Sequence, residues 1–398
     1  MSQLPLSGLR VLELGNYIAG PTAGRLLADF GAEVIKVERP GRGDELRNWR
    51  LHAGTTTSML FRTINRNKKS VVLDMKTPAG RDAVLDLVRH SDVVIENFRP
   101  GTLERWGLGP DRLEEVNPDV VLARISAFGQ TGPLAARPGF AAVAEAMGGL
   151  RQLVGEADRP PARVGVSIGD SLAGLYAAFG VLVSLHQKEK PGRLADRVID
   201  VALHEAVFSM MESLVPDHLA HGIERQRVGG RMEGIAPSNA YPCVDGTSVV
   251  IAGNGDSIFG RYMRAIGRPD LADDPDLATN AGRWARRDEL DRVITEWTAT
   301  RTRAEVLKVL DEAAVPAGPI YTAADIVADE QYRARDMIQT QPVDAGEVGF
   351  PGIVPVVGGT SLPVRSAGPD LGAHTREVLR DVLGRSDAEI DAITGDAA

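Results

Sequence analysis

Short apolar runs alternate with amphipathic segments along the first 125 residues of the chain. The runs GLRVLEL, AEVIKVE, SVVLDM (70–75), DVVIEN (92–97) and DVVLARISA (119–127) are rich in the residues that strands favour. TAGRLLADFG and AGRDAVLDLVRH (79–90) space their apolar residues as helices do, and Gly31 closes the first of them. Strands separated by helices predict a parallel sheet covered on both faces.

The middle of the chain changes character twice. Residues 128–168 are rich in Gly, Pro and Ala, which predicts loops around a short helix. SIGDSLAGLYAAFGVLVSLHQ (167–187) is then apolar nearly all round, which predicts a buried helix. Its apolar stretch, residues 172–185, is shorter than the roughly 20 residues that a membrane span needs. VIDVALHEAVFSMM (198–211) predicts a strand followed by a helix, or one long helix.

A second domain is expected from about residue 226 to residue 330. The strand TSVVIAG and helical patterns at 257–266, 288–299 and 302–314 predict a small α+β domain there. The tail contains the expected strands MIQTQ and IVPVVG and the amphipathic helix HTREVLRDVL. We therefore predict an α/β chain with a large domain of residues 1–225, completed by residues 331–398, and a small domain of 226–330.

Composition and charge exclude several classes of protein. The 398 residues are 43% hydrophobic and 25% charged, as is usual for a globular protein. The net charge of −9 argues against nucleic acid as a partner. The single cysteine, Cys243, permits no intrachain disulfide and fits a reducing, cytoplasmic compartment. The first residues, MSQLPLSGLRVLELG, contain no basic leader followed by a long apolar stretch, so we expect no secretory signal.

The first crossover indicates an anion site. ELGNYIAGPTAGRLL places a glycine-rich turn before a helix, where backbone N–H groups can bind phosphate. Gly15, Gly20 and Gly24 do not have the GxGxxG spacing, so an NAD site is disfavoured even though Glu38 ends the second strand, where it could bond a ribose. Four cations follow predicted strands and would gather at one rim of the sheet, namely Arg39, Lys76, Arg99 and Arg105.

Asp170 begins the long apolar helix and permits two interpretations. It is either the N-cap of a buried helix or a nucleophile towards an activated acyl carbon. AGNGDS (252–257) is either a turn or a loop that donates N–H groups to an oxyanion. The sequence contains no HExxH, CxxC, GxSxG or Walker A motif, so we expect no metal site.

Several motifs together resemble a known family. They are GLRVLELGNYIAGPTAGRLLADFGAEVIKVERPGRGDELR, NRNKKSVVLDMKTPAG, SDVVIENFRPG, ISAFGQTGPLAARPGF and GDSLAGLYAAFGVLVSLHQ. In this order they are similar to those of the class III CoA-transferases, also called the CaiB/BaiF family, which includes formyl-CoA transferase. The resemblance covers nearly the whole chain and is looser in the small domain.

The resemblance implies a homodimer of two interlocked rings, each with a Rossmann-like large domain built from both chain ends. It implies that Asp170 is catalytic and carries CoA as an aspartyl-CoA thioester between two mixed anhydrides. The positions that match the family's CoA contacts are Arg39, Leu73, Lys76, Asn97, Phe98, Arg105 and, near the active site, Arg137. AGNGDS matches a loop that covers the intermediate, without the family's run of consecutive glycines.

The expected reaction moves CoA from an acyl-CoA thioester to a free carboxylic acid, with CoA as substrate and no further cofactor. Loop cations at Arg137, Arg163 and Arg231 favour a dicarboxylate such as succinate, glutarate, malate or oxalate, and formate is a further possibility. Two alternatives stay open. An α-methylacyl-CoA racemase would pair its Asp with a His in a GHD-like segment, where this chain has GQTGPLAARPGF. A non-catalytic CoA-binding protein would keep the fold without turnover.

Overall fold

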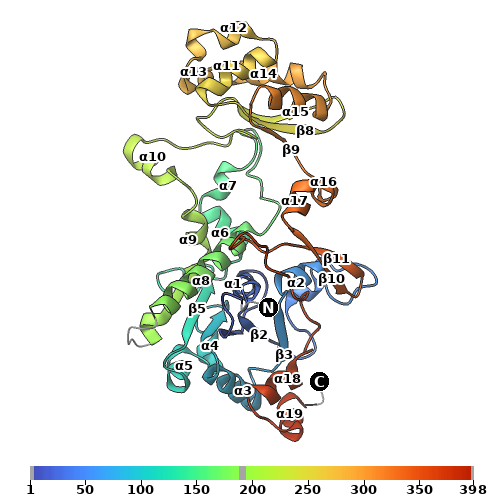
Figure 1. Ribbon diagram of the computed structural model, residues 1–398. Coiled ribbons are helices and arrows are strands. Elements are labelled where there is room, and N and C mark those ends of the chain that lie inside the picture. The colour runs from blue at the N-terminus through green and yellow to red at the C-terminus, as the bar shows by residue number, and fades with distance from the viewer. Residues whose placement is uncertain (1–3, 188–193, 396–398) are drawn as a thin grey trace. The chain divides into compact units, whose positions relative to one another are not determined.

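The computed structural model describes residues 4–187 and 194–395. The chain forms two compact units, shown in Figure 1. The large unit combines Met1–Leu150, Val164–Glu212 and Glu330–Ala398, and the small unit combines Arg151–Arg163 and Ser213–Asp329. Both chain ends thus belong to the large unit. The domain boundaries predicted at 225 and 330 stay predictions. In this structure residues 213–225 group with the small unit.

The large unit is built on a six-stranded sheet in the order β3-β2-β1-β4-β5-β6. Every neighbouring pair of strands is parallel, which confirms the predicted parallel sheet. The strands are β1 (Arg10–Glu13), β2 (Glu33–Glu38), β3 (Lys68–Val72), β4 (Val93–Glu96), β5 (Val121–Ser126) and β6 (Val198–Ala202). The strand order reverses direction between β1 and β4, and ligands of such sheets bind beyond the carboxyl ends of the strands at this point.

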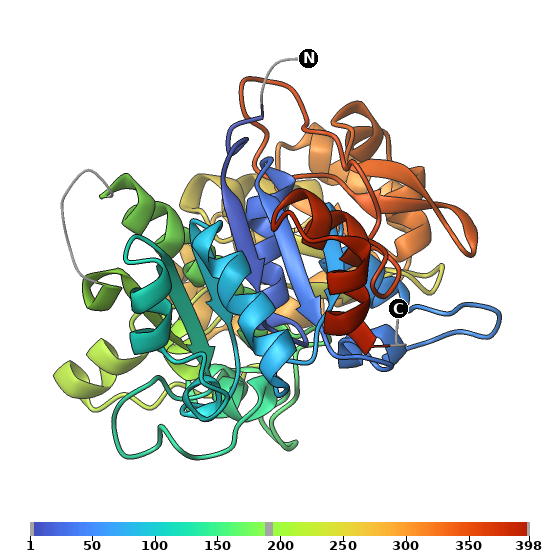
Figure 2. The ribbon, with the colours of Figure 1, turned by 90° about the horizontal axis from the view of Figure 1, so that it is seen from below.

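Alternate strand residues point into two separate cores. Leu12, Ile35 and Leu122 pack in one core, and their neighbours Val11, Val34 and Val121 pack in the other. The first core is covered by α3 (Pro78–Arg89), α4 (Thr102–Arg105), α5 (Pro110–Val116), α18 (Thr375–Asp381) and α19 (Asp387–Thr394). The second is covered by α1 (Ala19–Asp29), α6 (Ala141–Met147), α8 (Ile168–His186) and α9 (Leu203–Phe208), and Figure 2 shows helices flanking the strands.

α8 differs from the prediction of a helix buried all round. Gly174 lies against the first turn of α1, where an added Cβ would be 2.7 Å from the Ala19 carbonyl oxygen. Yet Leu175 is 50% exposed and Phe179 is 62% exposed, because neighbouring elements cover one side of the helix only. The expectation that this segment is too short for a membrane span is not met, since α8 has the length and hydropathy of one; a core helix passes the same test, and α8 packs on α1.

Short elements complete the large unit. They are the turn η1 (Glu45–Asn48), α2 (Met59–Ile64), η2 (Leu194–Arg197), α17 (Glu330–Ala334) and the hairpin of β10 (Ile338–Val343) with β11 (Gly346–Pro351), while α7 (Leu150–Leu153) lies at the boundary and belongs mostly to the small unit. The strand expected at IVPVVG is wrong, since only an isolated bridge joins Val357 to Thr360. Pro355 has no N–H to donate, and Gly358 adopts a left-handed φ of 66°.

The small unit contains a three-stranded antiparallel sheet of β7 (Ser238–Pro242), β8 (Ser248–Ala252) and β9 (Ala317–Pro319). The three predicted helices are confirmed as α11 (Asp256–Ala265), α14 (Arg287–Thr298) and α15 (Arg303–Glu312). Its core joins the sheet to these helices through residues such as Val249, Phe259 and Ile294. The other elements are α10 (Leu214–His221), α12 (Pro269–Ala272), η3 (Pro275–Leu277), α13 (Asn280–Ala285) and α16 (Ala323–Ala328).

Candidate active site

Asp170 lies in the first turn of α8 and is half-buried. The helix begins at Ile168 and Ser167 occupies the N-cap position, so the interpretation of Asp170 as the N-cap is wrong. Gly169, just before it, is buried and directs its N–H towards Glu145 of α6 at 3.5 Å. The positive end of the helix dipole favours an ionised carboxylate in a first turn. Asp170 therefore lies where its carboxylate is favoured in the ionised form, and its role as a nucleophile stays a prediction.

Gly174 fixes where Asp170 stands relative to the sheet. It is one turn further along α8, about 6 Å along the axis, and it contacts the first turn of α1 at Ala19 and Thr22. That turn follows directly from the carboxyl end of β1. Asp170 therefore belongs to the carboxyl edge of the sheet, where open α/β folds bind ligands.

Three of the predicted CoA contacts gather beyond β3 and β4. The Phe98 and Trp106 rings meet edge to face with centroids 5.1 Å apart, and the Lys76 Nζ lies 6.0 Å from the Trp106 ring centroid. Arg105 is exposed, immediately before Trp106, and donates to the Thr102 hydroxyl at 2.9 Å. Sequence reasoning missed Trp106, although ERWG beside a predicted contact was a usable signal. Exposed cations beside aromatic faces suit a phosphorylated nucleotide.

A buried ion pair stabilises the backbone that carries this cluster. Arg124 of β5 donates from Nε to Glu96 at 2.8 Å and pairs through Nη2 with Glu104 of α4 at 2.9 Å. The second oxygen of Glu96 accepts the Phe98 N–H at 2.8 Å. Burial raises the pKa of Glu96 to about 6, although Arg124 opposes the shift. The pair holds the turn after β4 and the helix that carries Arg105 in one arrangement.

The remaining predicted cations occupy loops at the same edge. Arg39 follows β2, is 44% exposed at its side chain, and pairs with Glu45 at 2.7 Å. Arg99 donates to the Ala136 carbonyl at 2.8 Å, which connects the turn after β4 with the loop that carries Arg137. Arg137 itself is exposed. These residues stay candidates for binding anionic groups of CoA.

Two residues predicted to contact CoA have side chains that interact with other parts of the protein. The Leu73 side chain is 1% exposed and packs inside the first core, so only its backbone is left to meet a ligand. The Asn97 side chain bonds both the N–H and the carbonyl of Asn16, at 2.8 and 2.7 Å. Asn97 therefore ties the end of β4 to the turn after β1. Its role in contacting CoA stays a prediction.

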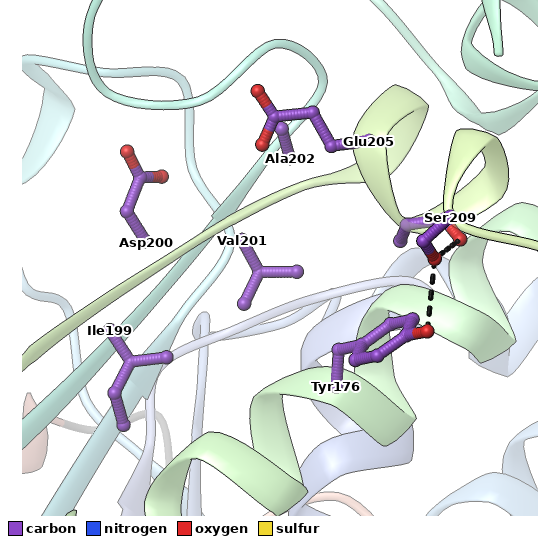
Figure 3. Close-up of a pocket in the computed structure, with 8 residues that line it drawn as sticks. Tyr176, Ile199, Asp200, Val201, Ala202, Glu205 and Ser209 are labelled. Carbon is purple, nitrogen blue, oxygen red and sulfur yellow. Dashed lines mark hydrogen bonds between the residues drawn. The ribbon is translucent and has the colours of Figure 1, made fainter. Parts of the chain in front are cut away.

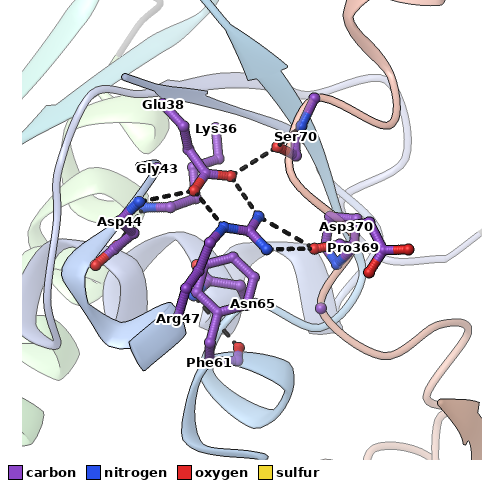
Figure 4. A network of polar contacts seen from close by, with 12 residues as sticks. Lys36, Glu38, Gly43, Asp44, Arg47, Phe61, Asn65, Ser70, Pro369 and Asp370 are labelled. Carbon is purple, nitrogen blue, oxygen red and sulfur yellow. Dashed lines mark hydrogen bonds and ion pairs between the residues drawn. The ribbon is translucent and has the colours of Figure 1, made fainter. Parts of the chain in front are cut away.

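Glu38 is the centre of a buried network, shown in Figure 4. Its carboxylate accepts from Arg47 at 2.7 and 2.8 Å, from the Asp44 N–H at 2.9 Å and from the Ser70 hydroxyl at 2.6 Å. Arg47 also lies over the Phe61 ring and donates to the Pro369 carbonyl. Although burial opposes it, the Arg47 and Lys36 charges lower the pKa of Glu38. Both oxygens are used, so Glu38 has none to spare for the ribose of NAD.

A second buried network crosses the first three strands. Glu13 is fully buried between Lys36, at 3.0 Å, and Lys68, at 2.7 Å. Lys36 also pairs with Asp44 at 2.8 Å. Burial would lower the pKa of Lys36, but the Asp44 and Glu13 carboxylates raise it. The signal for this network was visible as charged residues inside the apolar runs RVLE, EVIKVE and KKSVV, and it was not used.

The AGNGDS loop of the small unit is held by one arginine. Arg283 of α13 is fully buried and donates to the Asn254 carbonyl at 2.8 Å and to Asp256 at 2.6 Å. It also bonds the Ala236, Leu277 and Ala278 carbonyls. The loop is therefore fixed within its own unit, whether it serves as a turn or as a source of N–H donors.

A separate cavity of about 310 Å³ lies between α8, β6 and α9 (Figure 3). Tyr176 accepts a hydrogen bond from Ser209 at its wall, and Asp200 and Glu205 are also among the lining residues. Tyr176 is six residues after Asp170 and so emerges from a different side of α8. Two carboxylates repel the phosphates of CoA, so this cavity does not fit a CoA site.

No group of three His, Cys, Asp or Glu side chains suited to a metal ion occurs among residues 4–187 and 194–395. The histidine that the racemase alternative requires is absent from the segment after β5, which reads GQTGPLAARPGF. His204 of α9 does reach that segment from elsewhere in the sequence, with its ring 5.5 Å from the Phe128 ring. It lies edge to face against that ring, and its Nδ1 is 3.2 Å from the Ala127 carbonyl oxygen.

Comparison with known proteins agrees with this arrangement. The family model described as CoA-transferase family III matches residues 6–375. A succinyl-CoA–D-citramalate CoA-transferase of Chloroflexus aurantiacus is 46% identical over 97% of this chain and 96% of its own length. The succinyl-CoA–L-malate CoA-transferase beta subunit of the same organism is 38% identical over 98% and 96%.

A solved structure resembles the fold throughout. The crystal structure of a CaiB/BaiF family protein from Brucella suis has a TM-score of 0.84 and 34% identity, and the match covers 96% of this chain and all of that one. This likeness extends over both units, including the small one, where the motifs were less specific. The chain belongs to CoA-transferase family III and is an enzyme that transfers CoA to a carboxylic acid.

Proposed function

We propose that the chain transfers CoA from succinyl-CoA to a hydroxylated dicarboxylate of the citramalate or malate type, by way of a thioester on Asp170. The observation that carries the substrate class is the 46% identity, over nearly the whole of both chains, to an enzyme named for succinyl-CoA and D-citramalate. A second relative is named for succinyl-CoA and L-malate. Both named acceptors carry two carboxylates and a hydroxyl group.

The half-buried Asp170 supports the covalent route. One carboxylate oxygen attacks the thioester carbonyl of the donor, which forms a mixed anhydride and releases CoA as thiolate. The thiolate then attacks the Asp170 carbonyl carbon, so that aspartyl-CoA forms and the donor acid leaves. The acceptor carboxylate repeats these two steps in reverse and regenerates the Asp170 carboxylate. Each step exchanges one acyl bond for another, so it needs no metal ion and no cofactor besides CoA itself.

The loop cations support the recognition of anionic groups. Arg39, Lys76 and Arg105 are exposed at the carboxyl edge of the sheet, where a nucleotide and its phosphates would lie. Arg137 is exposed on the loop that Arg99 connects to the same edge. It is our candidate for the second carboxylate of the acceptor. Arg231 is less suited, because it pairs with Asp288 and Asp291 within the small unit.

We also propose that the enzyme is a cytoplasmic homodimer. α8 presents an apolar stripe of Leu175, Phe179, Leu182 and Val183, each at least 41% exposed. The family resemblance implies a homodimer, and we propose that a second copy of this chain covers this stripe. A Phe179→Glu variant should shift the mass measured by light scattering to that of a monomer. An unchanged dimer mass in this variant places the interface elsewhere.

The assignment of Asp170 is tested with Asp170→Asn. We expect a loss of transfer of about a thousand-fold or more, with the free energy of unfolding changed by less than about 1 kcal/mol. The matched control is Asp200→Asn, which removes an exposed carboxylate from the separate cavity and should stay active.

Two measurements complete the test. Hydroxylamine added with succinyl-CoA should convert Asp170 to a hydroxamate in the wild type and not in the Asn variant. A panel of carboxylic acids then gives the acceptor by its kcat/KM. A folded Asp170→Asn enzyme with wild-type turnover would refute the covalent route. Exchange of the α-hydrogen of the thioester with solvent, without any acceptor, would instead favour the racemase alternative.

A further inference from the structure

The turn after β1, residues 15–17, is held by side chains from other segments. Lys36 of β2 donates from Nζ to the Gly15 carbonyl at 2.7 Å. Asp44, which precedes η1, accepts the Tyr17 N–H through Oδ1 at 3.0 Å. Between these two, Asn97 bonds both backbone groups of Asn16. The carbonyl of Gly15, both groups of Asn16 and the N–H of Tyr17 thus all have a side-chain partner.

Lys36 and Asp44 act as one unit. Lys36 Nζ lies 2.8 Å from Asp44 Oδ2, so the anchor of the Gly15 carbonyl is joined to the anchor of the Tyr17 N–H. Lys36 is 1% exposed and Asp44 is fully buried. Glu13, at 3.0 Å from Lys36, holds the ammonium from its other side. Asp44 Oδ2 meets Lys36 by charge and proximity, without hydrogen-bond geometry, whereas Lys36 also donates to Glu13 and Gly15, so the buried pair restrains the groups that it bonds.

The turn needs such holding because its backbone is strained. Tyr17 has a φ of 63°, in the left-handed region that side chains other than glycine rarely adopt. Its ring contacts those of Trp49 and Phe140, with centroids 5.5 and 6.0 Å away. Strained residues of this kind persist where the surroundings determine them, and they are frequent at functional sites.

The turn also adjoins the element that carries Asp170. It leads directly into the first turn of α1, and Gly174 of α8 packs against that turn at Ala19. Phe140, which Tyr17 touches, immediately precedes α6, whose Glu145 approaches the residue before Asp170. A shift of residues 15–17 would therefore be felt on both helices that flank the carboxylate.

We propose that Lys36 and Asp44 are positioning residues of the transferase site. They act through the backbone of Gly15 and Tyr17 and keep the turn in the one conformation that suits the geometry around Asp170. Neither side chain meets a substrate, since both are buried. The proposal rests on the role proposed for Asp170, and small displacements of this kind lower turnover substantially.

Substitutions of Asp44 can test its hydrogen bond to the turn separately from its other hydrogen bonds. Besides the Tyr17 N–H, Asp44 accepts the Leu46 N–H at 2.9 Å as the N-cap of η1. In Asp44→Ser the side chain still caps but is too short to reach Tyr17. In Asp44→Asn the amide oxygen keeps both N–H bonds and Nδ2 replaces the oxygen that faces Lys36 Nζ, so both variants lose the charge that faces Lys36. The two variants therefore differ in the Tyr17 contact.

We expect kcat to fall about ten-fold or more in Asp44→Ser and less than about three-fold in Asp44→Asn, with KM for the acyl-CoA unchanged within about three-fold in both. The matched control is Asp274→Ala in the small unit, since Asp274 caps η3 in the same way, through the Asp276 N–H at 2.9 Å. This control should retain wild-type kcat. Circular dichroism and thermal melts show that each variant is folded.

Equal kcat in Asp44→Ser and wild type, or equal losses in Ser and Asn, would overturn the proposal. A rise in KM with unchanged kcat would also contradict it, because it would place Asp44 in CoA binding. If Asp44→Ser does not fold, Lys36→Arg replaces it, with the expected fall again in kcat. Asp170→Asn is assayed in parallel. Its activity tests the covalent route, whereas the ratio of kcat between Asp44→Asn and Asp44→Ser tests the role of the turn, so each proposal can fail alone.

Discussion

A buried cation holds a candidate functional loop in each unit, but the two cations interact with their partners in different ways. Lys36 in the large unit has two carboxylates and one carbonyl as partners. Arg283 in the small unit makes five hydrogen bonds, four to carbonyls and one to Asp256. Asp44 is fully buried beside Lys36, whereas the Asp256 side chain is 72% exposed.

The difference teaches that burial of a charge has two separate requirements. Around Lys36 the main requirement is neutralisation, because Glu13 and Asp44 are themselves buried charges. Around Arg283 it is hydrogen bonding, because several buried carbonyls need donors and the planar guanidinium supplies five in a fixed fork. The stability of the first network therefore depends on charge balance, and that of the second depends on hydrogen-bond geometry.

Replacing each cation by methionine gives the largest expected effect. Lys36→Met removes the ion pair of the buried Asp44 and leaves Glu13 with Lys68 alone, and it should lower the free energy of unfolding by about 3–5 kcal/mol at pH 7. Arg283→Met leaves several carbonyls without donors and should cost about 3 kcal/mol. Urea denaturation measures both. Arg292→Met, which removes an exposed ion pair with Glu296, is the control and should change stability by less than about 0.5 kcal/mol.

The pH dependence of the stability losses in Lys36→Met and Arg283→Met tests whether the two cations differ in the way described. In Lys36→Met the pKa of Glu13 should rise, because burial raises it and the Lys36 charge no longer lowers it, so the folded state of the variant binds more protons as the pH falls. The loss should therefore shrink between pH 7 and pH 5. Carbonyl groups do not titrate, so the loss in Arg283→Met should stay constant over this range. Parallel pH profiles for the two variants would contradict the distinction.

Arg283→Lys should have a smaller effect, a loss of about 1–3 kcal/mol. The charge is kept, but an ammonium has three donors on one atom and does not span the partners from Ala236 to Asn254. The melting temperature of this variant measures the loss. Full stability in Arg283→Lys would show that charge, and not the fork, is what the small unit requires.

A last expected effect, confined to alkaline pH, concerns Lys68, the second lysine on Glu13. Burial lowers its pKa to about 8, although Glu13 opposes the shift. Between pH 8 and the unfolded value near 10.5 the unfolded chain binds more protons, so stability should rise with pH. The slope is at most about 1.4 kcal/mol per pH unit for one proton. In Lys68→Met this contribution disappears, and an identical pH profile in the two proteins would exclude it.

Much of the fold followed from local patterns. The period of apolar residues predicted the parallel sheet, and helices expected at 257–266, 288–299 and 302–314 lie within two residues of α11, α14 and α15. The end of the tail was misread at IVPVVG, where Pro355 and Gly358 disfavour a strand. α8 was predicted as buried throughout because hydrophobicity reports the preference of a side chain for burial, and not which neighbours are available to cover it.

The candidate site was predicted in part. Motif spacing and strand ends led to Asp170 and to the exposed cations, because residues after parallel strands meet at one edge. Trp106, the Glu96–Arg124 pair and the Lys36–Asp44 pair were not found. Each joins side chains from different strands or loops, and Lys36 also pairs with Glu13, 23 residues before it. Local patterns in a single sequence do not predict which distant side chains pair.

The sequence by itself determined the elements, the parallel sheet and the residue types available for acyl transfer, since these depend on local periodicity and on chemistry carried by single residues. Only the tertiary structure decided that Asp170 is a first-turn residue and not the N-cap, that Leu73 is buried, and that Glu38 has no oxygen to spare. The physical reason is that partners of a buried polar group come from distant segments, and packing alone selects them.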